Sequence, residues 1–248
     1  MFSYFFKLTK FSKSENMKAV SILSGGLDST VATMYAKALG YDLLAITYNY
    51  GQRAAKREIE AAKKISEILK IEHKVVELNF VKEFGKSALI TNKEIPKLTF
   101  EDLDSEKAFE TMRAVWVPAR NVIFLAIASG FAEAIDGEKI FIGINKEEGV
   151  TFPDNTIEFV EAFNRALEYG TLNKVKVEAP LYDKTKEEIV KLGKELEEKL
   201  GVKVLKYSYS CYKDNGESFL HCGECESCLR RKRAFKLANI EDETKYLR

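Results

Sequence analysis

One short segment near the start of the chain has the residue types that hold a phosphate group. Gly25 and Gly26 follow an apolar run of strand length, and Ser29 and Thr30 open a stretch with helical periodicity. Glycines let the backbone approach an anion closely, hydroxyl groups donate hydrogen bonds to it, and a helix N-terminus offers unpaired N–H groups. The segment has neither the Gly-Lys-Ser/Thr of a Walker A loop nor the GxGxxG of a dinucleotide fold. A phosphate-binding turn is one interpretation, and a plain strand-to-helix connection is the other.

Asp28 lies inside this turn and favours the first interpretation. Its carboxylate would repel a phosphate unless it bound Mg²⁺, a ribose or a substrate group. A site for a nucleotide with Mg²⁺ accounts for both the glycines and the acid. We therefore expect the nucleotide to contact the residues around the turn, which are Leu23, Ser24, Gly25, Gly26, Leu27, Asp28, Ser29, Thr30, Val31, Ala32 and Thr33.

Four cysteines lie in the last fifth of the chain with the spacing of a metal site. Cys222, Cys225 and Cys228 are three residues apart, whereas the disulfides of a small secreted protein are spread along the chain. Four thiolates hold Zn²⁺ in a closed tetrahedral site, and closed sites are structural. We expect one structural zinc per chain, held by these three thiolates and by Cys211, with His221 as a competing ligand. No cysteine then remains to carry a persulfide.

A few basic and polar residues at the ends of expected elements are candidates for binding anions. Arg53 and Arg120 are placed where a guanidinium group pairs with a carboxylate or a phosphate, and a surface ion pair is the alternative. Asn121 either orients a substrate edge or caps its helix. Lys186 falls in the first turn of an expected helix, where acidic residues are usual, so we expect a phosphate beside it.

The elements that must position these residues alternate between strands and helices. Apolar runs of strand length are followed by stretches of helical period, and the spacing of Thr185 and Glu188 is that of a capping box. Val81–Thr111 lacks a pattern and is expected to be a long insertion near the site. The expected strands are Lys18–Leu23, Leu43–Tyr48, Lys74–Leu78 and Lys139–Ile144, and the expected helices are Ser29–Leu39, Ala54–Lys70, Ala119–Ile135, Ile157–Glu168 and Lys186–Leu200.

This alternation predicts an α/β fold with a Rossmann-like parallel sheet and helices on both faces. Ligands of such sheets bind at the carboxyl ends of the strands, near a topological switch point. The 248 residues contain no repeat and no linker, so we expect one domain at 17–205 and a zinc-binding segment with a helix, 206–248, packed on it. Residues 1–16 are expected to be an extension that is disordered or lies upstream of a true start at Met17.

Residues 24–29, with the sequence Ser-Gly-Gly-Leu-Asp-Ser, resemble the pyrophosphatase loop of the adenine nucleotide alpha-hydrolase-like superfamily. Members of this superfamily cleave ATP between the α and β phosphates and adenylate an oxygen of the substrate. The resemblance implies that the nucleotide is ATP and that Asp28 and Ser29 act in catalysis.

Four further segments, together with this loop, are similar to the 7-cyano-7-deazaguanine synthase family. The similarity covers nearly the whole chain from Met17. It implies a ligase that forms C–N bonds and converts 7-carboxy-7-deazaguanine, ammonia and ATP to the nitrile, a precursor of queuosine or archaeosine in tRNA. It further implies that Arg120 and Lys186 are catalytic and that Gln52, Arg53 and Asn121 bind the substrate. The four segments are Tyr50-Gly51-Gln52-Arg53, Val117-Pro118-Ala119-Arg120-Asn121, Ala179-Pro180-Leu181 with Lys186, and the four cysteines.

Residues 147–154 depart from the pattern of this family. Bacterial members carry a stretch of the type Asp-Tyr-Ser-Gly-Tyr-Pro-Asp, whereas this chain has Glu-Glu-Gly-Val-Thr-Phe-Pro-Asp. Phe152 and Asp154 align with the end of that stretch. We therefore expect Phe152 to stack on a purine-like ring and Asp154 to accept hydrogen bonds from its N–H edge. A plain Pro-Asp turn before a helix is the alternative.

Charge and hydropathy limit the classes of partner. A formal net charge of +1 gives no general basic field for nucleic acid, and the apolar stretch Val122–Ile135 is too short to span a bilayer. The run Arg230-Arg231-Lys232-Arg233 is expected to be a solvated helix face beside a phosphate-rich site rather than a nucleic-acid site. No export signal is recognisable, so we expect a cytoplasmic protein with small-molecule partners and no stable nucleic-acid partner. A homodimer stays open.

Two alternative functions also stay open. The first is another enzyme with the same loop, either a tRNA thiolase or an amide-forming synthetase. The absence of a spare cysteine and of a basic RNA-binding extension argues against thiolation. The second is a zinc-ribbon nucleic-acid-binding protein with an inert nucleotide fold, which steeply salt-dependent affinity for tRNA without ATP turnover would identify.

Overall fold

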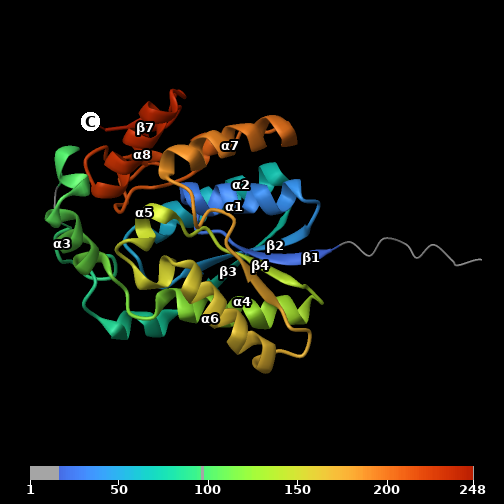
Figure 1. The fold of residues 1–248 in the computed structure, drawn as a ribbon. Coiled ribbons are helices and arrows are strands. Elements are labelled where there is room, and N and C mark those ends of the chain that lie inside the picture. Colours follow the sequence, from blue (N-terminus) through green and yellow to red (C-terminus); the bar gives the residue numbers. More distant parts are fainter. Residues whose placement is uncertain (1–16, 96–97, 248) are drawn as a thin grey trace, which may run out of the picture.

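Five parallel strands form the central sheet of the computed structural model, which describes residues 17–95 and 98–247 (Figure 1). The predicted extension 1–16 lies outside the described residues. The sheet has the order β3-β2-β1-β4-β5, and every neighbouring pair is parallel. This confirms the α/β prediction. The strands are β1 (Lys18–Ile22), β2 (Asp42–Asn49), β3 (Glu72–Glu77), β4 (Lys139–Phe141) and β5 (Lys176–Glu178).

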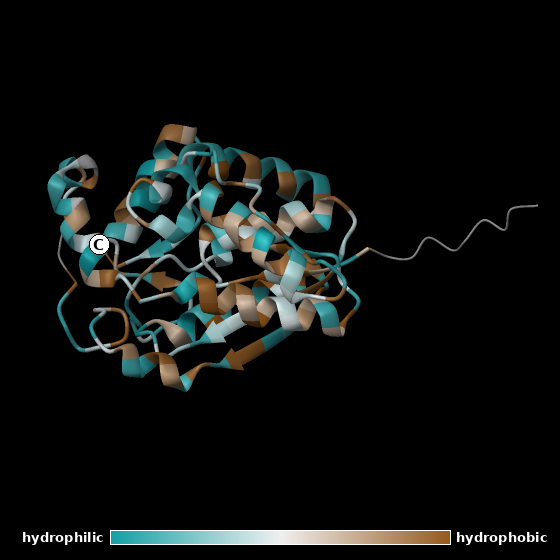
Figure 2. Cartoon of the chain, turned by 60° about the horizontal axis from the view of Figure 1, so that its bottom comes forward, coloured by the Kyte–Doolittle hydropathy of each residue, from teal (hydrophilic) through white to brown (hydrophobic). Residues whose placement is uncertain are grey.

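The sequence of each strand fits its place in the sheet. β1 and β2 are nearly continuous apolar runs and are buried along almost their whole length, as expected for inner parallel strands covered on both faces. β3 is an edge strand and is largely exposed, and it carries charged residues that discourage pairing with another chain. Several strands are brown in Figure 2, whereas the helices alternate between brown and teal.

Helices cover both faces of this sheet (Figure 1). α1 (Leu27–Ala38), α2 (Ala55–Leu69) and α7 (Lys186–Leu200) lie on one face, and α4 (Arg120–Ala134) and α6 (Ile157–Gly170) on the other. Each face has its own apolar core. The five expected helices are confirmed to within two residues at each end, and the capping box of Thr185 and Glu188 is present at the start of α7.

The chain reverses its direction across the sheet between β1 and β4. It runs outward from β1 to β2 and β3, then returns to β4 and continues to β5 on the other side. The first turns after β1 and β4 therefore diverge and leave a crevice at the carboxyl ends of these strands. Figure 1 shows α5 (Lys146–Gly149) and the C-terminal elements at this end of the sheet.

The C-terminal segment folds around the four cysteines. It contains the 3-10 helix η4 (Leu205–Tyr207), β6 (Leu220–His221), α8 (Glu226–Ala238) and β7 (Lys245–Tyr246), with β6 and β7 paired in parallel. The buried cysteines pack against Ala54 and Ala61 at α2, and α8 packs against α7. The boundary predicted at residue 205 stays a prediction.

Several elements differ from the sequence-based expectation. Val81–Thr111 is not without pattern, because the 3-10 helices η1 (Asn79–Phe84) and η2 (Glu101–Asp104) and most of α3 (Glu106–Val115) overlap it. Ser105 caps α3 by accepting a hydrogen bond from the Lys107 N–H. α5, η3 (Pro153–Asn155) and β5 were not expected, because elements of three or four residues are too short to show a period. The expected strand Lys139–Ile144 ends at Phe141.

Among the described residues, no single helix has the length and apolar content to cross a bilayer. Phe109–Val115 and Arg120–Ala134 reach that length only together, and they are bent by 50° at the break between them.

Candidate functional site

The glycine-rich turn connects β1 to α1 at the crevice. The Ser29 hydroxyl lies 2.9 Å from the Ser24 hydroxyl and donates to the Gly26 carbonyl, and the Thr30 hydroxyl donates to the same carbonyl at 2.7 Å. The Gly26 N-cap supplies no side-chain acceptor to the first N–H groups of α1. These groups and the positive end of the helix dipole form a site for an anion. The structure thus supports the phosphate-binding interpretation over a plain connection.

Two features of the structure require glycine at position 25: its backbone conformation and the close approach of a neighbouring carbonyl group. Its φ is +83°, and a Cβ at this position would lie 2.5 Å from the Glu58 carbonyl oxygen. We expect Gly25→Ala to lower the free energy of unfolding by about 2–4 kcal/mol and to abolish ATP binding, because a left-handed alanine and a backbone clash both displace the turn. Urea unfolding and calorimetric ATP titration measure the two effects.

Gly40→Ala is the matched control for this prediction. Gly40 has a φ of +92°, but nothing lies within 4 Å of an added Cβ. It should lose only about 1 kcal/mol of stability, and its ATP binding should be unchanged. Equal losses in the two variants would show that the close approach to Glu58 is unimportant.

Part of the predicted nucleotide-contacting set lies beneath the turn instead of facing the crevice. Leu23, Val31 and Ala32 are in the apolar core, and the Thr33 hydroxyl bonds to the Ser21 hydroxyl and the Ser29 carbonyl. Their side chains hold the turn from behind, and the expectation that these residues contact the nucleotide stays a prediction. Of the predicted set, the residues that line the crevice are Ser24, Gly26, Leu27, Asp28 and Ser29.

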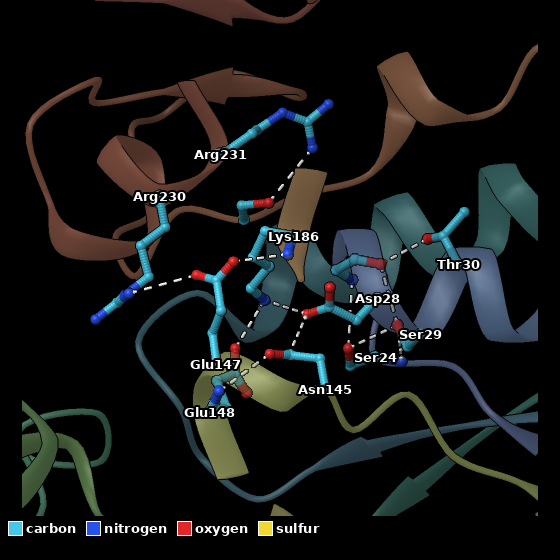
Figure 3. Close-up of polar contacts among 12 residues, drawn as sticks. Ser24, Asp28, Ser29, Thr30, Asn145, Glu147, Glu148, Lys186, Arg230 and Arg231 are labelled. Atoms are coloured by element: carbon cyan, nitrogen blue, oxygen red, sulfur yellow. Dashed lines mark hydrogen bonds and ion pairs between the residues drawn. The ribbon is translucent and has the colours of Figure 1, made fainter. Parts of the chain in front are cut away.

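Lys186 lies between two carboxylates at the centre of the crevice (Figure 3). Its Nζ donates to Asp28 Oδ2 and, at 2.7 Å, to Glu148 Oε1. Asn145 at the N-cap of α5 adds a longer contact of 3.4 Å to Asp28. Asp28 Oδ1 is buried and has no hydrogen-bond partner within the described part of the chain. The prediction that a phosphate neighbours Lys186 stays a prediction, since two acids hold the ammonium group here.

Burial and the charge of Lys186 together set the protonation of this cluster. Burial raises the pKa of Asp28 above its usual value, although Lys186 opposes the shift. Burial acts in the same direction on Glu148, but there Lys186 outweighs it and the pKa is lowered. The two carboxylates raise the pKa of Lys186 despite its own burial. The ammonium group is therefore charged at neutral pH.

Arg120 reaches the crevice from the start of α4. The preceding Ala119 adopts a φ of +53°, which is unfavourable for alanine and sets the angle at which the helix begins. The Tyr50 hydroxyl and, after it, the Asp154 and Glu148 carboxyl groups hold the pKa of Arg120 above its usual value in spite of burial. Arg120 is thus a fixed positive charge facing the interior of the site.

Asn121 and Asp154 lie together on the wall behind Arg120. The Asn121 side chain donates to the Asp154 backbone carbonyl at 3.1 Å and does not cap its own helix. Asp154 Oδ1 accepts from the Asn155 amide, while Oδ2 is buried without a partner among the residues described. Burial raises the pKa of Asp154. Asp154 is not part of the cavity lining, so a contact with substrate would require this wall to move.

Gln52 and Arg53 differ in what they do. Gln52 is buried and donates to the Tyr48 carbonyl at 3.1 Å and to Glu58 Oε2 at 2.7 Å. Arg53 is exposed and donates to the Lys93 carbonyl at 3.0 Å. Both border the crevice, so a role in substrate binding stays a prediction for each.

The crevice consists of two adjoining cavities of about 190 and 210 Å³. The first is lined by charged side chains of α5, α7 and α8 and by aromatic side chains of the connecting segments. The second opens onto the apolar ends of β1, β2 and the segment after β4. Eight residues border both cavities and so mark their junction: Ser24, Gly26, Asp28, Glu58, Leu89, Arg120, Glu148 and Tyr212.

Aromatic side chains form one wall of the first cavity. The rings of Phe152 and Trp116 are stacked, with centroids 5.9 Å apart and planes at 18°. Sequence reasoning proposed Phe152 but missed Trp116, Tyr212, Arg230 and Glu58. Trp116 directly precedes a recognised motif, Tyr212 directly follows Cys211, and Arg230 begins the basic run, which are signals that could have found them.

The basic run on α8 is not a solvated face. Arg231 is buried and bonds to Asp242, the Ser208 hydroxyl and the Leu205 carbonyl. Arg230 pairs with Glu226 and, at 3.7 Å, with Glu147, and both arginines border the first cavity (Figure 3). The expected solvation is therefore wrong, since acidic partners and carbonyl groups turn these charges inward. Both arginines border the crevice, and the expectation that a phosphate-rich site lies beside them stays a prediction.

The four cysteine thiols meet in one buried cluster. Their sulfur atoms all lie within 4.8 Å of one another. The distances are 3.4 Å between Cys225 and Cys228 and 3.9 Å between Cys222 and Cys228. A tetrahedron with metal–sulfur bonds of about 2.3 Å places its sulfurs roughly 3.8 Å apart, so the cluster has the size to hold a metal ion. His221 is not in this group, and its Nε2 instead accepts from the Ser210 N–H.

Two solved structures are distant likenesses of this chain. A 4-thiouridine synthetase in complex with RNA and bound ATP is 20% identical, with a TM-score of 0.41, and the match covers 89% of this chain and 53% of that chain. An NH3-dependent NAD synthetase from Campylobacter jejuni is 22% identical, with a TM-score of 0.39, over 76% of this chain and 66% of that one. Likenesses of this size support no conclusion about function.

Comparison with curated proteins is far more informative. The chain is 79% identical to the 7-cyano-7-deazaguanine synthase of Methanocaldococcus jannaschii, over 93% of this chain and 100% of that protein. It is 66% identical to that of Methanococcus maripaludis strain S2 over 93% of this chain and 99% of the relative. The family model for queuosine biosynthesis protein QueC matches residues 18–239. These matches extend over the loop, the crevice and the cysteine cluster alike, and the chain therefore belongs to the QueC family of queuosine biosynthesis proteins.

Proposed function

We propose that this protein converts 7-carboxy-7-deazaguanine, ammonia and ATP to 7-cyano-7-deazaguanine, with release of AMP and pyrophosphate. One observation carries the proposal. In a chain 79% identical to a relative of that name, the anion-binding turn, Lys186 and Arg120 meet an aromatic wall at a single crevice. The product is the nitrile precursor of queuosine or archaeosine in tRNA.

ATP would span the junction of the two cavities. Its phosphates fit the turn and the N-terminus of α1, and its adenine fits the second cavity, which Ile22, Ile46 and Phe124 make apolar. The buried, unpartnered Oδ1 of Asp28 is a suitable oxygen ligand for Mg²⁺, and Glu148 offers a second. A bound Mg²⁺ would neutralise charge on the phosphates.

The acid substrate would occupy the first cavity. Trp116 and Phe152 offer flat apolar surfaces to a deazapurine ring, and Arg120 and Arg230 offer guanidinium groups to its carboxylate. The proposed contacts of Gln52, Arg53 and Asn121, which border the second cavity, require the substrate to reach the junction of the two cavities. The proposed contact of Asp154, which borders neither cavity, requires its wall to move and would use its unpartnered oxygen.

The reaction requires two activations of the same carbon. A carboxylate resists attack by ammonia, so its oxygen first takes AMP from ATP and pyrophosphate leaves. Ammonia then displaces AMP to give the amide. The amide oxygen takes AMP from a second ATP, and loss of this AMP leaves the nitrile. Lys186, Arg120 and the Ser29 hydroxyl stabilise the negative charge that develops on the phosphates in each adenylation.

For the cysteine cluster we propose one zinc ion with a structural role. Four thiolates leave no open position for a substrate, and the donor set is the one that zinc prefers. The ion would tie the segment after Ser210 to α8, whose Arg230 and Arg231 border the first cavity. Zinc would therefore act on the site through the positions of α8 and of the segment around Cys211, whose Tyr212 borders both cavities.

The proposed partners are small molecules in the cytoplasm, without stable binding of nucleic acid. The basic residues of α8 contact groups of the protein itself, which argues against the zinc-ribbon alternative. All four cysteines of the chain lie in the cluster, which argues against a thiolase. A homodimer remains compatible with this proposal.

Mass spectrometry of a complete reaction tests the proposed function. The purified protein is incubated with ATP, Mg²⁺, ammonium and 7-carboxy-7-deazaguanine, and we expect the nitrile with two AMP per turnover. Omission of ammonium should stop the reaction before the amide. ADP as the nucleotide product, or no nitrile, would contradict the proposal.

A further inference from the structure

The proposed reaction needs a group that takes a proton from ammonium. Ammonia is mostly protonated near neutral pH, and the ammonium ion has no lone pair with which to attack the acyl carbon. A useful base must reach both the acyl group and the incoming ion, so it should lie where the two cavities meet. Glu58, on the face of α2 toward the glycine-rich turn, is in this position.

Glu58 differs from the other acidic residues of the crevice in forming no ion pair, although the charge of Arg120 acts on it from beyond ion-pair distance. Lys186 holds two of them, and arginines of α8 hold two more. Among the described residues, no ion pair involves Glu58, so its negative charge is available to a small cation. The five carboxylates that line the cavities are Asp28, Glu58, Glu147, Glu148 and Glu226.

The carboxylate of Glu58 is nevertheless fixed in position. Its Oε2 accepts a 2.7 Å hydrogen bond from the Gln52 amide, and Gln52 is itself held by the Tyr48 carbonyl and the Tyr50 N–H. Its Oε1 accepts no hydrogen bond from the residues that the structure describes. One oxygen thus anchors the group, and the other is left to meet a donor in the cavity.

We propose that Glu58 binds the ammonium ion at the junction of the cavities and accepts its proton, which makes it the general base of amide formation. This inference rests on the proposed function. One N–H bond of ammonium breaks, and its proton goes to Glu58 Oε1. The freed lone pair forms the C–N bond to the acyl carbon, the bond from that carbon to the AMP oxygen breaks, and a second proton leaves the nitrogen to solvent.

The charges around Glu58 suit this task. Burial raises its pKa to about 6, while the Gln52 hydrogen bond and the Arg120 charge act in the opposite direction. Cys211 of the cysteine cluster and Tyr50 also face it. Glu58 is therefore ionised near neutral pH yet more basic than an ordinary carboxylate, which favours proton transfer.

A change of nucleophile tests this role directly. Hydroxylamine is uncharged near neutral pH and attacks an acyl adenylate to give a hydroxamic acid without needing a base. We expect Glu58→Gln to slow amide and nitrile formation from ammonium by roughly 10²-fold or more, and to raise the KM for ammonium. Two rates of the variant should stay within about threefold of those of the unmodified protein. These are the rate of hydroxamate formation and the rate at which pyrophosphate exchanges into ATP in the presence of the substrate acid.

The pH profile adds a second readout. With ammonium as the nitrogen source, the rate of the unmodified protein should decrease below about pH 6 as Glu58 is protonated. This decrease should be steeper than the decrease in the concentration of free ammonia. The rate of Glu58→Gln should depend on pH only through the concentration of free ammonia. Glu58→Asp should recover part of the rate lost in Glu58→Gln. Glu67→Gln, on the exposed side of the same helix, is the matched control and should behave as the unmodified protein.

The outcomes separate the base from other roles. If Glu58→Gln makes nitrile at the unmodified rate, or loses hydroxamate formation as severely as nitrile formation, Glu58 is not the base. Thermal melting identifies a folding defect, in which case Glu58→Asp decides the matter by the same two nucleophiles. If the unmodified protein makes no nitrile, it is the proposed function that fails.

Discussion

Replacing Lys186 by methionine should reduce kcat/KM for ATP by roughly 10²–10³-fold, or about 2.7–4 kcal/mol. Lys186 is a buried cation that contacts both Asp28 and Glu148 at the mouth of the anion-binding turn. Methionine keeps much of the volume but leaves two neighbouring carboxylates unneutralised where the phosphates must bind. The pKa of Asp28 should then rise further, because Lys186 now opposes that rise. Pyrophosphate release measured against ATP concentration gives the effect.

Lys191→Met is the control for this substitution. Lys191 lies in the same helix, is about half exposed and, within the described residues, forms an ion pair with Glu187 alone. Its loss should change kcat/KM little, since exposed pairs contribute little. A Lys186→Met protein with unchanged kinetics would show that the phosphates do not pass near this side chain.

Removal of the metal should have the largest effect on stability. The sulfur cluster holds the C-terminal segment together, and a structural zinc supplies much of the folding free energy of such a segment. A loss of about 4 kcal/mol would lower Tm by roughly 8–16 °C for a chain of this size. We expect Cys228→Ser and treatment with a strong chelator each to lower Tm by at least this much. Activity should also be lost, because α8 would be displaced from the first cavity.

Thiol counting makes the chelation experiment specific. The chain has four cysteines, and all belong to the cluster. Chelation should therefore release one zinc and expose four reactive thiols together. Added Mg²⁺ should not restore activity, whereas added Zn²⁺ should. A protein that loses its zinc but keeps its Tm and its activity would refute the structural role.

The sequence determined the main elements of the fold because their signals are local. The apolar runs of β1 and β2, the period of α2 and the capping box of α7 depend on neighbours along the chain, and each element forms where expected. The turn from Ser24 to Ser29 is local in the same sense. Short elements such as β5 carry no readable period, because pairing with β4 defines them.

The residues of the candidate site that belong to recognisable motifs could be predicted from the sequence. Lys186 and Arg120 were found from the ends of their helices and from the family resemblance, and both border the crevice. Glu58 was not found, since a glutamate within an amphipathic helix looks like any solvated residue. What makes it distinctive is that no cation of the described residues forms an ion pair with it, which depends on every element that lines the two cavities.

The amino-acid sequence by itself determined the parallel α/β architecture, the anion-binding turn and the grouping of four cysteines, because spacing along the chain is enough for each. Only the tertiary structure decided which charges neutralise one another. Lys186 reaches Asp28 across 158 positions of sequence, and Arg231 turns inward because Asp242 and the Leu205 carbonyl are there to receive it. Such pairings follow from distances in space, and those distances are fixed only when α5, α7 and α8 close over the ends of the strands.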